Sequence, residues 1–318
     1  MAEIGGTLAD APPRRPAPAD AFASVDEVER TLAQHSYIAE PGLAMAVFLS
    51  LKLGKPLLLE GEAGVGKTEI AKVLTDSLGA EMIRLQCYEG IDVASAVYEW
   101  NYLRQILFLR AAESGDENAG DHTRERLQEV FGPEFLLKRP LLQALDARDK
   151  PIVLLIDEID RADDEFEAFL LELLSDFQVT IPEIGTIRAN VVPAVVITSN
   201  RTREIHDALK RRCIYHWIDY PSIEKERRIV QTRVPSLPPT LSEEVVRFVQ
   251  DLRMQDLYKL PGVAETLDWA RALVTLGQRE LDERVVVDTL GCLLKYQEDF
   301  KAVEGDALKR LVATARKG

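Results

Sequence analysis

Two short, uninterrupted apolar runs lie in the middle of the chain, and each ends in polar residues. They are PIVLLIDEID at residues 151–160 and PAVVITSN at residues 193–200. Runs of this kind are typical of strands that are buried on both faces of a parallel sheet. Shorter apolar runs at 56–59 and 81–87 predict two more strands. The pattern indicates an α/β fold in which strands alternate with helices over roughly residues 40–220.

Apolar residues at helical spacing fill much of the sequence between these strands. Residues 179–189 differ, because they read as two short strands turned at Glu183-Ile184-Gly185, and they predict a hairpin. The helices are expected at Val25 to Leu53 with a break at Pro41-Gly42, at Lys67 to Leu78, and at 164–177.

The last third of the chain shows helical periodicity and little β signal. Ser222 is the expected N-cap of a first helix, and the capping-box spacing of Thr240 and Glu243 predicts the start of a second. At the other end of the chain, residues 9–21 are rich in Pro and Ala, which predicts a disordered or extended leader. A charged, glycine-containing segment at 111–126 predicts a surface loop.

The composition is that of a globular protein with a surplus of acid. Of the 318 residues, 46% are hydrophobic and 29% are charged, and the formal net charge is −14. This balance argues against general binding of duplex nucleic acid, which depends on a surplus of Lys and Arg. The three cysteines and four histidines lack metal-ligand spacing. Without an apolar run of about 20 residues or a signal pattern, the chain is expected in the cytoplasm.

A glycine-rich sequence, GEAGVGKT at residues 61–68, stands between a predicted strand and a predicted helix. It satisfies the pattern G-x-x-x-x-G-K-[ST], in which backbone N–H groups and a helix N-terminus hold phosphate oxygens. Lys67 is expected to reach the β- and γ-phosphates of ATP, and Thr68 to bind Mg²⁺ through its hydroxyl. The alternative is a chance glycine turn. The predicted ATP contacts are Gly61, Glu62, Ala63, Gly64, Val65, Gly66, Lys67, Thr68 and Glu69.

Two carboxylates, Asp157 and Glu158, end the buried strand at 151–160. Ligands of open α/β sheets bind at this end of the strands. One carboxylate would hold Mg²⁺, and the other would polarise a water for attack on the γ-phosphate, which favours hydrolysis over transfer to another acceptor. The alternative is a solvated acidic turn, because Asp160, Asp163 and Asp164 follow.

Polar and basic residues follow the second buried strand. Asn200 could orient the attacking water or contact the γ-phosphate, or it could be a simple turn residue. Residues 201–213 carry five basic side chains. They are compatible with a nucleic-acid patch, a solvated helix face or an arginine that reaches the γ-phosphate in a neighbouring subunit, and the last interpretation is preferred.

Together these motifs resemble those of AAA+ ATPases, through GEAGVGKT, LLIDEIDRADDEFEAFLLELLSDFQVTI, VVITSN and DALKRRC. The acidic strand that runs into a long helix and a QVTI-like hairpin is most similar to the MoxR branch. Within it, RLQCYEGIDVASAVYEWNY, EFLLKRPLLQAL, YHWIDYP and PGVAETLDWA resemble CoxD-type members. Those members are associated with maturation of the molybdenum–copper site of carbon monoxide dehydrogenase. The resemblance covers about residues 25–300.

The resemblance implies a P-loop αβα parallel-sheet AAA+ domain followed by an all-helical lid. It also implies a homo-oligomeric ring, usually a hexamer, with ATP bound between neighbouring subunits. The implied parts are a leader at 1–22, the AAA+ domain at 23–220 and the lid at 221–318. An insert near 88–105 and a hairpin at 178–190 before the sensor strand would face the ring pore.

The family's functional residues can be carried over by position. One departure is that the family's lid arginine, in a Gly-x-Ser-x-Arg pattern, is missing where residues 262–266 read GVAET. Arg271 could supply this second sensor, which stays unassigned. The implied catalytic residues are Lys67 of the P-loop, Glu158 as base, Asn200 as sensor and Arg212 as the trans-acting arginine, with Arg211 as runner-up; Thr68 and Asp157 lie on the Mg²⁺ side.

Three aromatic residues in the insert, Tyr98, Trp100 and Tyr102, would share one face of a strand. They either grip a client polypeptide in the pore or pack against the parent domain, and packing is favoured because aromatic side chains carry large burial terms. Relatives act with a partner that contains a von Willebrand A domain. Such a partner and a client metalloenzyme are therefore expected, in the cytoplasm or at the inner face of its membrane, with no nucleic acid.

Three functions compete. A remodelling ATPase is favoured by Asp157, Glu158, Asn200 and Arg212 together. A nucleic-acid-dependent AAA+ motor is motivated by the basic residues at 201–212, but the net charge of −14 counts against it. A P-loop kinase would need an acceptor pocket, of which the helical region gives no sign.

Overall fold

A computed structural model describes residues 20–113, 129–147 and 150–317 of the protein. The predicted leader at 1–22 lies almost entirely outside these residues, and so does most of the predicted surface loop at 111–126. Within the described ranges, none of the helices combines the length and the apolar character needed to span a bilayer.

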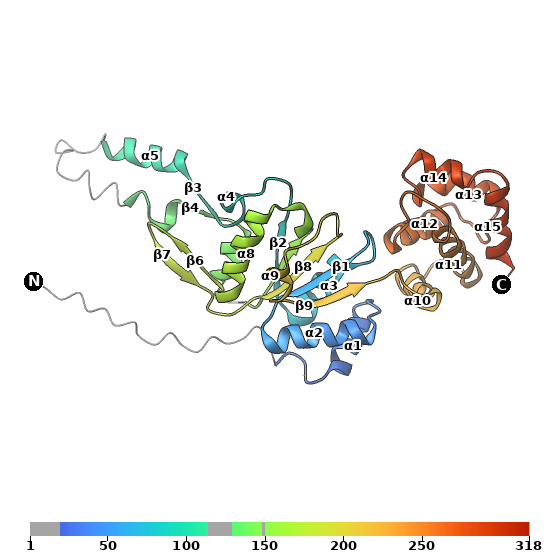
Figure 1. The fold of residues 1–318 in the computed structure, drawn as a ribbon, viewed down its shortest axis with the longest axis horizontal. Helices are drawn as coiled ribbons and strands as arrows, with labels where there is room; N and C mark the ends of the chain where they lie inside the picture. The colour runs from blue at the N-terminus through green and yellow to red at the C-terminus, as the bar shows by residue number, and fades with distance from the viewer. Residues whose placement is uncertain (1–19, 114–128, 148–149, 318) are drawn as a thin grey trace, which may run out of the picture. The chain divides into compact units, whose positions relative to one another are not determined.

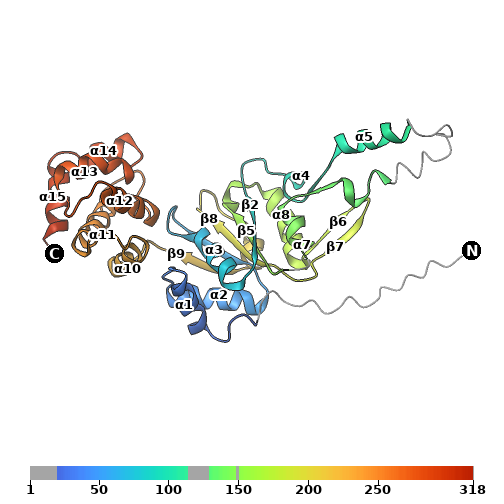
Figure 2. The ribbon, with the colours of Figure 1, turned by 180° about the vertical axis from the view of Figure 1, so that it is seen from behind.

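The main sheet has five strands in the order β2-β5-β8-β1-β9. β5 pairs in parallel with β2 and with β8, and the register sets Gln86 opposite Asp157. Helices separate the strands along the chain (Figure 1; Figure 2). This arrangement confirms the predicted parallel α/β sheet. The strands are β1 (Leu57–Gly61), β2 (Glu81–Gln86), β5 (Ile152–Asp157), β8 (Ala194–Ser199) and β9 (Ile214–Ile218).

Two small antiparallel ribbons accompany the sheet, β3 (Tyr98–Trp100) with β4 (Leu136–Lys138) and β6 (Gln178–Ile181) with β7 (Gly185–Arg188). The second ribbon is the predicted hairpin, since Ile181 pairs with Gly185 across the turn. The helices up to β9 are α1 (Val25–Gln34), α2 (Pro41–Leu53), α3 (Lys67–Leu78), α4 (Val93–Ala96), α5 (Tyr102–Glu113), α7 (Pro140–Leu145), α8 (Asp164–Asp176) and α9 (Asp207–Lys210).

The described residues form two compact units. Unit 1 comprises the described residues up to Ser24 together with 45–58 and 74–215. Unit 2 comprises 25–44, 59–73 and the described residues from His216 on. The chain passes from one unit to the other just before α1 and again within α2, β1, α3 and β9. The glycine-rich loop therefore belongs to unit 2 and the acidic pair to unit 1.

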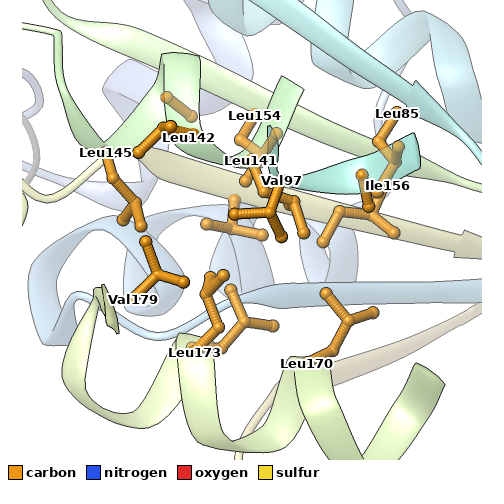
Figure 3. Packing of buried hydrophobic residues seen from close by; sticks show 14 of the residues in the cluster. Leu85, Val97, Leu141, Leu142, Leu145, Leu154, Ile156, Leu170, Leu173 and Val179 are labelled. Carbon is orange, nitrogen blue, oxygen red and sulfur yellow. The ribbon is translucent and has the colours of Figure 1, made fainter. Parts of the chain in front are cut away.

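The core of unit 1 explains why its central strands are uninterrupted apolar runs. All six residues of β5 and all six of β8 are buried. Figure 3 shows leucines of α7 and α8, among them Leu142 and Leu170, packed around Leu154 of β5. A strand covered on both sides has no polar face, and its sequence therefore cannot alternate.

Several local predictions need correction. The helix break was predicted at Pro41-Gly42, but it lies before Pro41, which is the first residue of α2. Proline suits the first position of a helix, because its missing N–H would have no partner there in any case. Thr240 is not an N-cap, since Pro238 precedes α11 (Pro239–Arg253) and Thr240 lies inside it. The aromatic alternation ends early: Tyr98 and Trp100 lie in β3, but Tyr102 begins α5.

The C-terminal part of unit 2 is all helical, as predicted. Ser222 caps α10 as expected, by accepting a hydrogen bond from the N–H of Lys225. The core is built around Phe248 and Trp269, both fully buried, with ring centroids 5.1 Å apart. Besides α11, the helices are α10 (Ile223–Arg233), α12 (Val263–Thr275), α13 (Glu283–Thr289), α14 (Gln297–Ala302) and α15 (Asp306–Arg316).

Candidate functional site

The glycine-rich loop joins the end of β1 to the start of α3. Gly64 and Gly66 have φ of 78° and 98°, conformations that favour glycine. Phosphate-binding loops use such conformations to turn backbone N–H groups inward. Lys67, the first residue of α3, is 6% exposed. Its Nζ donates to the carbonyl of Gly61 at 2.8 Å and to that of Glu62 at 2.6 Å. The lysine therefore closes the loop on itself beside the N-terminus of a twelve-residue helix.

The start of α12 rests directly on this loop. The N–H of Ala264 donates to the carbonyl of Gly64 at 3.1 Å. Gly262, the N-cap of α12, is so close that a Cβ there would lie 2.7 Å from the carbonyl oxygen of Ala63 and 2.9 Å from the Cα of Gly64. Only glycine fits this contact without a shift of backbone. The GVAET stretch thus contacts the loop through its main chain.

A cavity of about 180 Å³ in unit 2 adjoins the loop. Its charged lining includes an ion pair in which Arg233 of α10 donates to Glu69 of α3 at 2.7 Å. Burial would raise the pKa of Glu69, but hydrogen bonds from Arg233 and Lys72 lower it overall. Burial raises the pKa of Tyr37, which lies against Gly66, and nearby acidic groups add to the shift. The lining residues include Tyr37, Ile38, Gly64, Gly66, Glu69, Lys225, Arg233 and Leu267.

The acidic pair lies in unit 1, at the carboxyl end of β5. Asp157 is 2% exposed. Its Oδ1 accepts a hydrogen bond from the hydroxyl of Thr198 on β8, and its Oδ2 accepts one from Arg84 on β2 at 2.6 Å. Neighbouring strands on both sides therefore fix both oxygens of this carboxylate.

Glu158 follows in a left-handed backbone conformation, with φ of 55°. Such a conformation costs a non-glycine residue about 1–3 kcal/mol and is found more often at functional sites. Its N–H donates to the hydroxyl of Thr198 at 2.9 Å. Its carboxylate accepts hydrogen bonds from Asn200 at 3.2 Å and from Gln86 at 3.1 Å. The predicted base and the predicted sensor are thus in direct contact.

Asp160 is not part of a solvated turn. It is 3% exposed, and its carboxylate accepts the N–H of Asn200 at 3.1 Å and the N–H and hydroxyl of Thr202 at 2.9 and 2.7 Å. Burial would raise the pKa of Asp160, but these hydrogen bonds lower it overall. Asp160 therefore holds the turn after β8 that presents Asn200. Asp163 likewise caps α8 through the N–H of Phe166.

The basic segment at 201–213 divides into two parts. Arg203 forms an ion pair with the buried Glu167 and donates to the carbonyl of Ala162, so it braces α8. Arg211 and Arg212 follow α9 and are exposed. An exposed arginine is available to another chain, and the trans-acting role of Arg212 stays a prediction.

Two further predictions can be placed. Arg271 lies on the exposed face of α12, where it pairs with Asp268 at 3.0 Å, and it does not line the cavity. Of the three aromatic residues, Trp100 is 8% exposed and packs edge-on against Phe131, whereas Tyr102 is 62% exposed. Packing therefore explains Trp100, and Tyr102 points to solvent.

Sequence reasoning missed several residues of both regions. Arg84 and Gln86 could have been noticed, because residues two apart on a strand share a face and this strand was predicted. Tyr37 and Arg233 had no signal, since both are distant in sequence from the glycine-rich loop and reach the cavity only through the fold.

Comparison with known proteins identifies the class of the central region. Residues 47–183 match the model of the AAA ATPase domain. The match includes the glycine-rich loop, β5 and the acidic pair, and the chain therefore contains an AAA ATPase-type domain.

Relatives of the chain extend beyond that domain. An uncharacterized protein of Staphylococcus saprophyticus is 22% identical over 268 residues, which are 80% of this chain and 91% of the relative. An uncharacterized protein of Staphylococcus epidermidis is 24% identical over 267 residues, with the same coverage.

Solved structures similar to this chain include RuvB of Thermotoga maritima. One mutant of that protein has a TM-score of 0.47 at 16% identity, covering 94% of this chain and 85% of that one. Another structure of Thermotoga maritima RuvB, described as a Holliday junction branch migration motor, has a TM-score of 0.45 at 15% identity. The match covers 93% of this chain and 85% of that one.

Proposed function

We propose that this protein is a MoxR-type AAA+ ATPase that hydrolyses ATP to remodel a client protein. The observation that carries the proposal is the contact between Glu158 and Asn200 at the carboxyl end of the sheet, beside an Asp157 whose two oxygens are already held. A base and an amide that orients water are what hydrolysis of a phosphoanhydride needs. A kinase would instead require a second substrate pocket.

The glycine-rich loop and its cavity suit ATP. The loop offers inward backbone N–H groups, the buried Lys67 and a helix N-terminus to the phosphates. The cavity is small beside the roughly 300–1,000 Å³ of ordinary ligand pockets, so it would hold the base and ribose while the phosphates lie on the loop. Its mixture of Tyr37, Ile38 and Leu267 with charged groups suits an aromatic base joined to a polar sugar.

The residues also suit Mg²⁺, which prefers oxygen ligands. Thr68 and Asp157 would hold it, with phosphate oxygens and water completing the shell. A Mg²⁺ site of this kind needs few protein ligands. Among the described residues, no group of three or more His, Cys, Asp or Glu side chains is placed to hold a metal ion. When bound, the ion would neutralise charge on the phosphates.

In the proposed reaction, the chain's own groups position a water and move its proton. Glu158 accepts the proton as the water oxygen bonds to the γ-phosphorus, and the bond from that phosphorus to the β–γ bridging oxygen breaks, so that ADP leaves. Asn200 orients the water beside Glu158. Lys67 leaves the loop carbonyls for phosphate oxygens. Arg212 of a neighbouring chain would stabilise the charge that develops on the γ-phosphate.

The proposal extends to the client through the resemblance to CoxD-type members. The client would be a molybdenum hydroxylase similar to carbon monoxide dehydrogenase, whose metal cofactor is assembled with the help of ATP hydrolysis. The working assembly would be a homo-oligomeric ring, with six subunits as the usual number, and a partner with a von Willebrand A domain. The exposed Arg211 and Arg212 support a site completed by a second chain.

The central experiment is the variant Glu158→Gln. It should bind a fluorescent ATP analogue as the wild type does, while kcat for ATP falls by about 100- to 10,000-fold, the usual contribution of a general base. Glu165→Gln, an exposed glutamate of α8, is the matched control and should hydrolyse ATP at the wild-type rate. Unchanged hydrolysis by Glu158→Gln would remove Glu158 from the base role.

The shared site is tested by mixing chains. Glu158→Gln and Arg212→Ala chains, each inactive alone, should regain part of the wild-type rate together, because some interfaces then contain both intact residues. Failure to regain any activity would contradict a trans-acting Arg212. A rate that rises on addition of DNA or RNA at low salt would instead favour the nucleic-acid motor.

A further inference from the structure

An arginine forms an ion pair with Asp157, the carboxylate that would bind Mg²⁺ in the proposed function. Arg84 lies on β2, next to β5 in the sheet. Its Nη2 donates to Oδ2 of Asp157 at 2.6 Å and also to the side-chain oxygen of Gln86. Arg84 thus lies between two acceptors, one on its own strand and one on the neighbouring strand.

The same contacts reach the proposed base. A guanidinium group only donates hydrogen bonds, so Arg84 must meet the oxygen of the Gln86 amide. The amide NH₂ is therefore turned toward Glu158, to whose Oε2 it donates at 3.1 Å. Arg84 and Gln86 together hold both members of the acidic pair from the β2 side.

The two partners of the ion pair differ in exposure. The Asp157 side chain is 3% exposed and the Arg84 side chain is 51% exposed. A buried carboxylate without a nearby cation is costly, because it loses its hydration. An exposed guanidinium loses little when it leaves, since water receives it. Arg84 can therefore give way to another cation at little cost, whereas the buried Asp157 carboxylate gains from having a cation beside it.

We infer that Arg84 is the resident counter-cation of Asp157 and that Mg²⁺ must displace it on arriving with the nucleotide. The inference rests on the proposed function, because it concerns the same carboxylate. Arg84 is a positioning residue: it holds Asp157 and Gln86 in place and then moves aside. The protein would accordingly need more Mg²⁺ for nucleotide binding than a chain without this arginine.

The experiment titrates Mg²⁺ against binding of a fluorescent, non-hydrolysable ATP analogue to the full chain. Arg84→Met removes the competing cation, so the half-saturating Mg²⁺ concentration should fall about two- to fivefold, the upper part of the range for partly exposed ion pairs. Arg84→Lys keeps the charge and should need as much Mg²⁺ as the wild type. Melting temperatures without ligand check that each variant folds, and Arg84→Gln is a second neutral variant.

A matched control separates this local effect from net charge. Arg284→Met removes an arginine that is 91% exposed and weakly paired on α13, and it should leave the Mg²⁺ requirement unchanged. If folded Arg84→Met and Arg84→Gln need the same Mg²⁺ as Arg284→Met, the inference is wrong. If the wild type shows no Mg²⁺-dependent binding at all, the nucleotide site itself fails, and this inference fails with it.

Discussion

The glycine-rich loop and the acidic pair are built by opposite means. In the loop, the groups proposed to bind phosphate are backbone N–H groups, and the close contacts with α12 also involve main-chain atoms. At the acidic pair, each group is held by side chains from neighbouring segments, among them Thr198, Arg84 and Asn200. One region depends on the shape of the backbone, and the other depends on a hydrogen-bond network.

The difference predicts different sensitivities. A backbone-built region should be damaged most by added atoms, because there is no room for a Cβ. A network-built region should be damaged most by removed partners, because a buried charged or polar group then loses its hydrogen bonds. Three predictions test this contrast, beginning with the largest expected effect.

The largest loss of stability is expected in a second buried hydrogen-bond network. It lies in unit 2, next to the contact between the start of α12 and the glycine-rich loop. Arg253 donates to both carboxylate oxygens of the fully buried Glu226 at 2.7 Å, and to the carbonyl of Pro261 just before Gly262. Arg253→Met should lower the free energy of unfolding by about 3–5 kcal/mol, because it leaves a buried charge without its partner. Chemical denaturation followed by circular dichroism measures this change.

A double variant and a surface control sharpen this result. Replacing both partners, Arg253→Met with Glu226→Met, should recover most of the loss, since no unpaired charge remains. Arg271→Met breaks an exposed pair and should change stability by less than about 0.5 kcal/mol. Equal losses for the single and double variants would contradict the charge argument.

An intermediate effect is expected where the main chain of α12 meets the loop. Gly262→Ala forces a shift of Ala63 or Gly64, because the added Cβ would lie 2.7 Å from a carbonyl oxygen. Overpacking of this kind costs about 1–3 kcal/mol, which corresponds to roughly 5- to 150-fold weaker nucleotide binding if the loop is what moves. Fluorescence titration with the ATP analogue measures the affinity.

Gly291→Ala is the matched control for this substitution. A Cβ at Gly291 would meet no atom within 4 Å, so binding should match that of the wild type. Identical affinities for the two alanine variants would show that the contact between α12 and the loop does not constrain the nucleotide site.

The smallest effect is expected at the turn that presents Asn200. Thr202→Val removes one of the hydrogen bonds that lower the pKa of Asp160 and should cost about 1 kcal/mol at pH 7. A lowered pKa means that ionised Asp160 contributes stability above its unfolded pKa of about 3.9, and that this contribution is lost as pH falls through the folded value. The difference between variant and wild type should therefore narrow toward pH 3.

Denaturation curves at pH 7, 5 and 3 check this prediction. Thr232→Val is a suitable control, because the Thr232 hydroxyl donates a hydrogen bond to the carbonyl of Arg228 within its own helix. A Thr202→Val deficit that stays constant down to pH 3 would mean that the hydroxyl does not act through the charge of Asp160.

The sequence by itself determined the parts whose chemistry is local. A parallel strand buried on both faces must be an apolar run, and β5 and β8 were predicted for that reason. A phosphate loop must carry glycines at fixed spacing, and α3 begins and ends where it was predicted. One helix start was predicted wrongly, because the capping-box spacing of a threonine three residues before a glutamate also occurs inside helices, as at Thr240 of α11.

Only the tertiary structure decided which side chains surround the acidic pair and the cavity. Arg84 and Thr198 are 73 and 41 residues from Asp157 along the chain, and strand order alone makes them neighbours. Arg233 meets Glu69 from 164 residues away. Backbone requirements leave a pattern in consecutive residues, whereas hydrogen-bond partners need only meet in space. The physical reason is that a side-chain contact can form at any sequence separation.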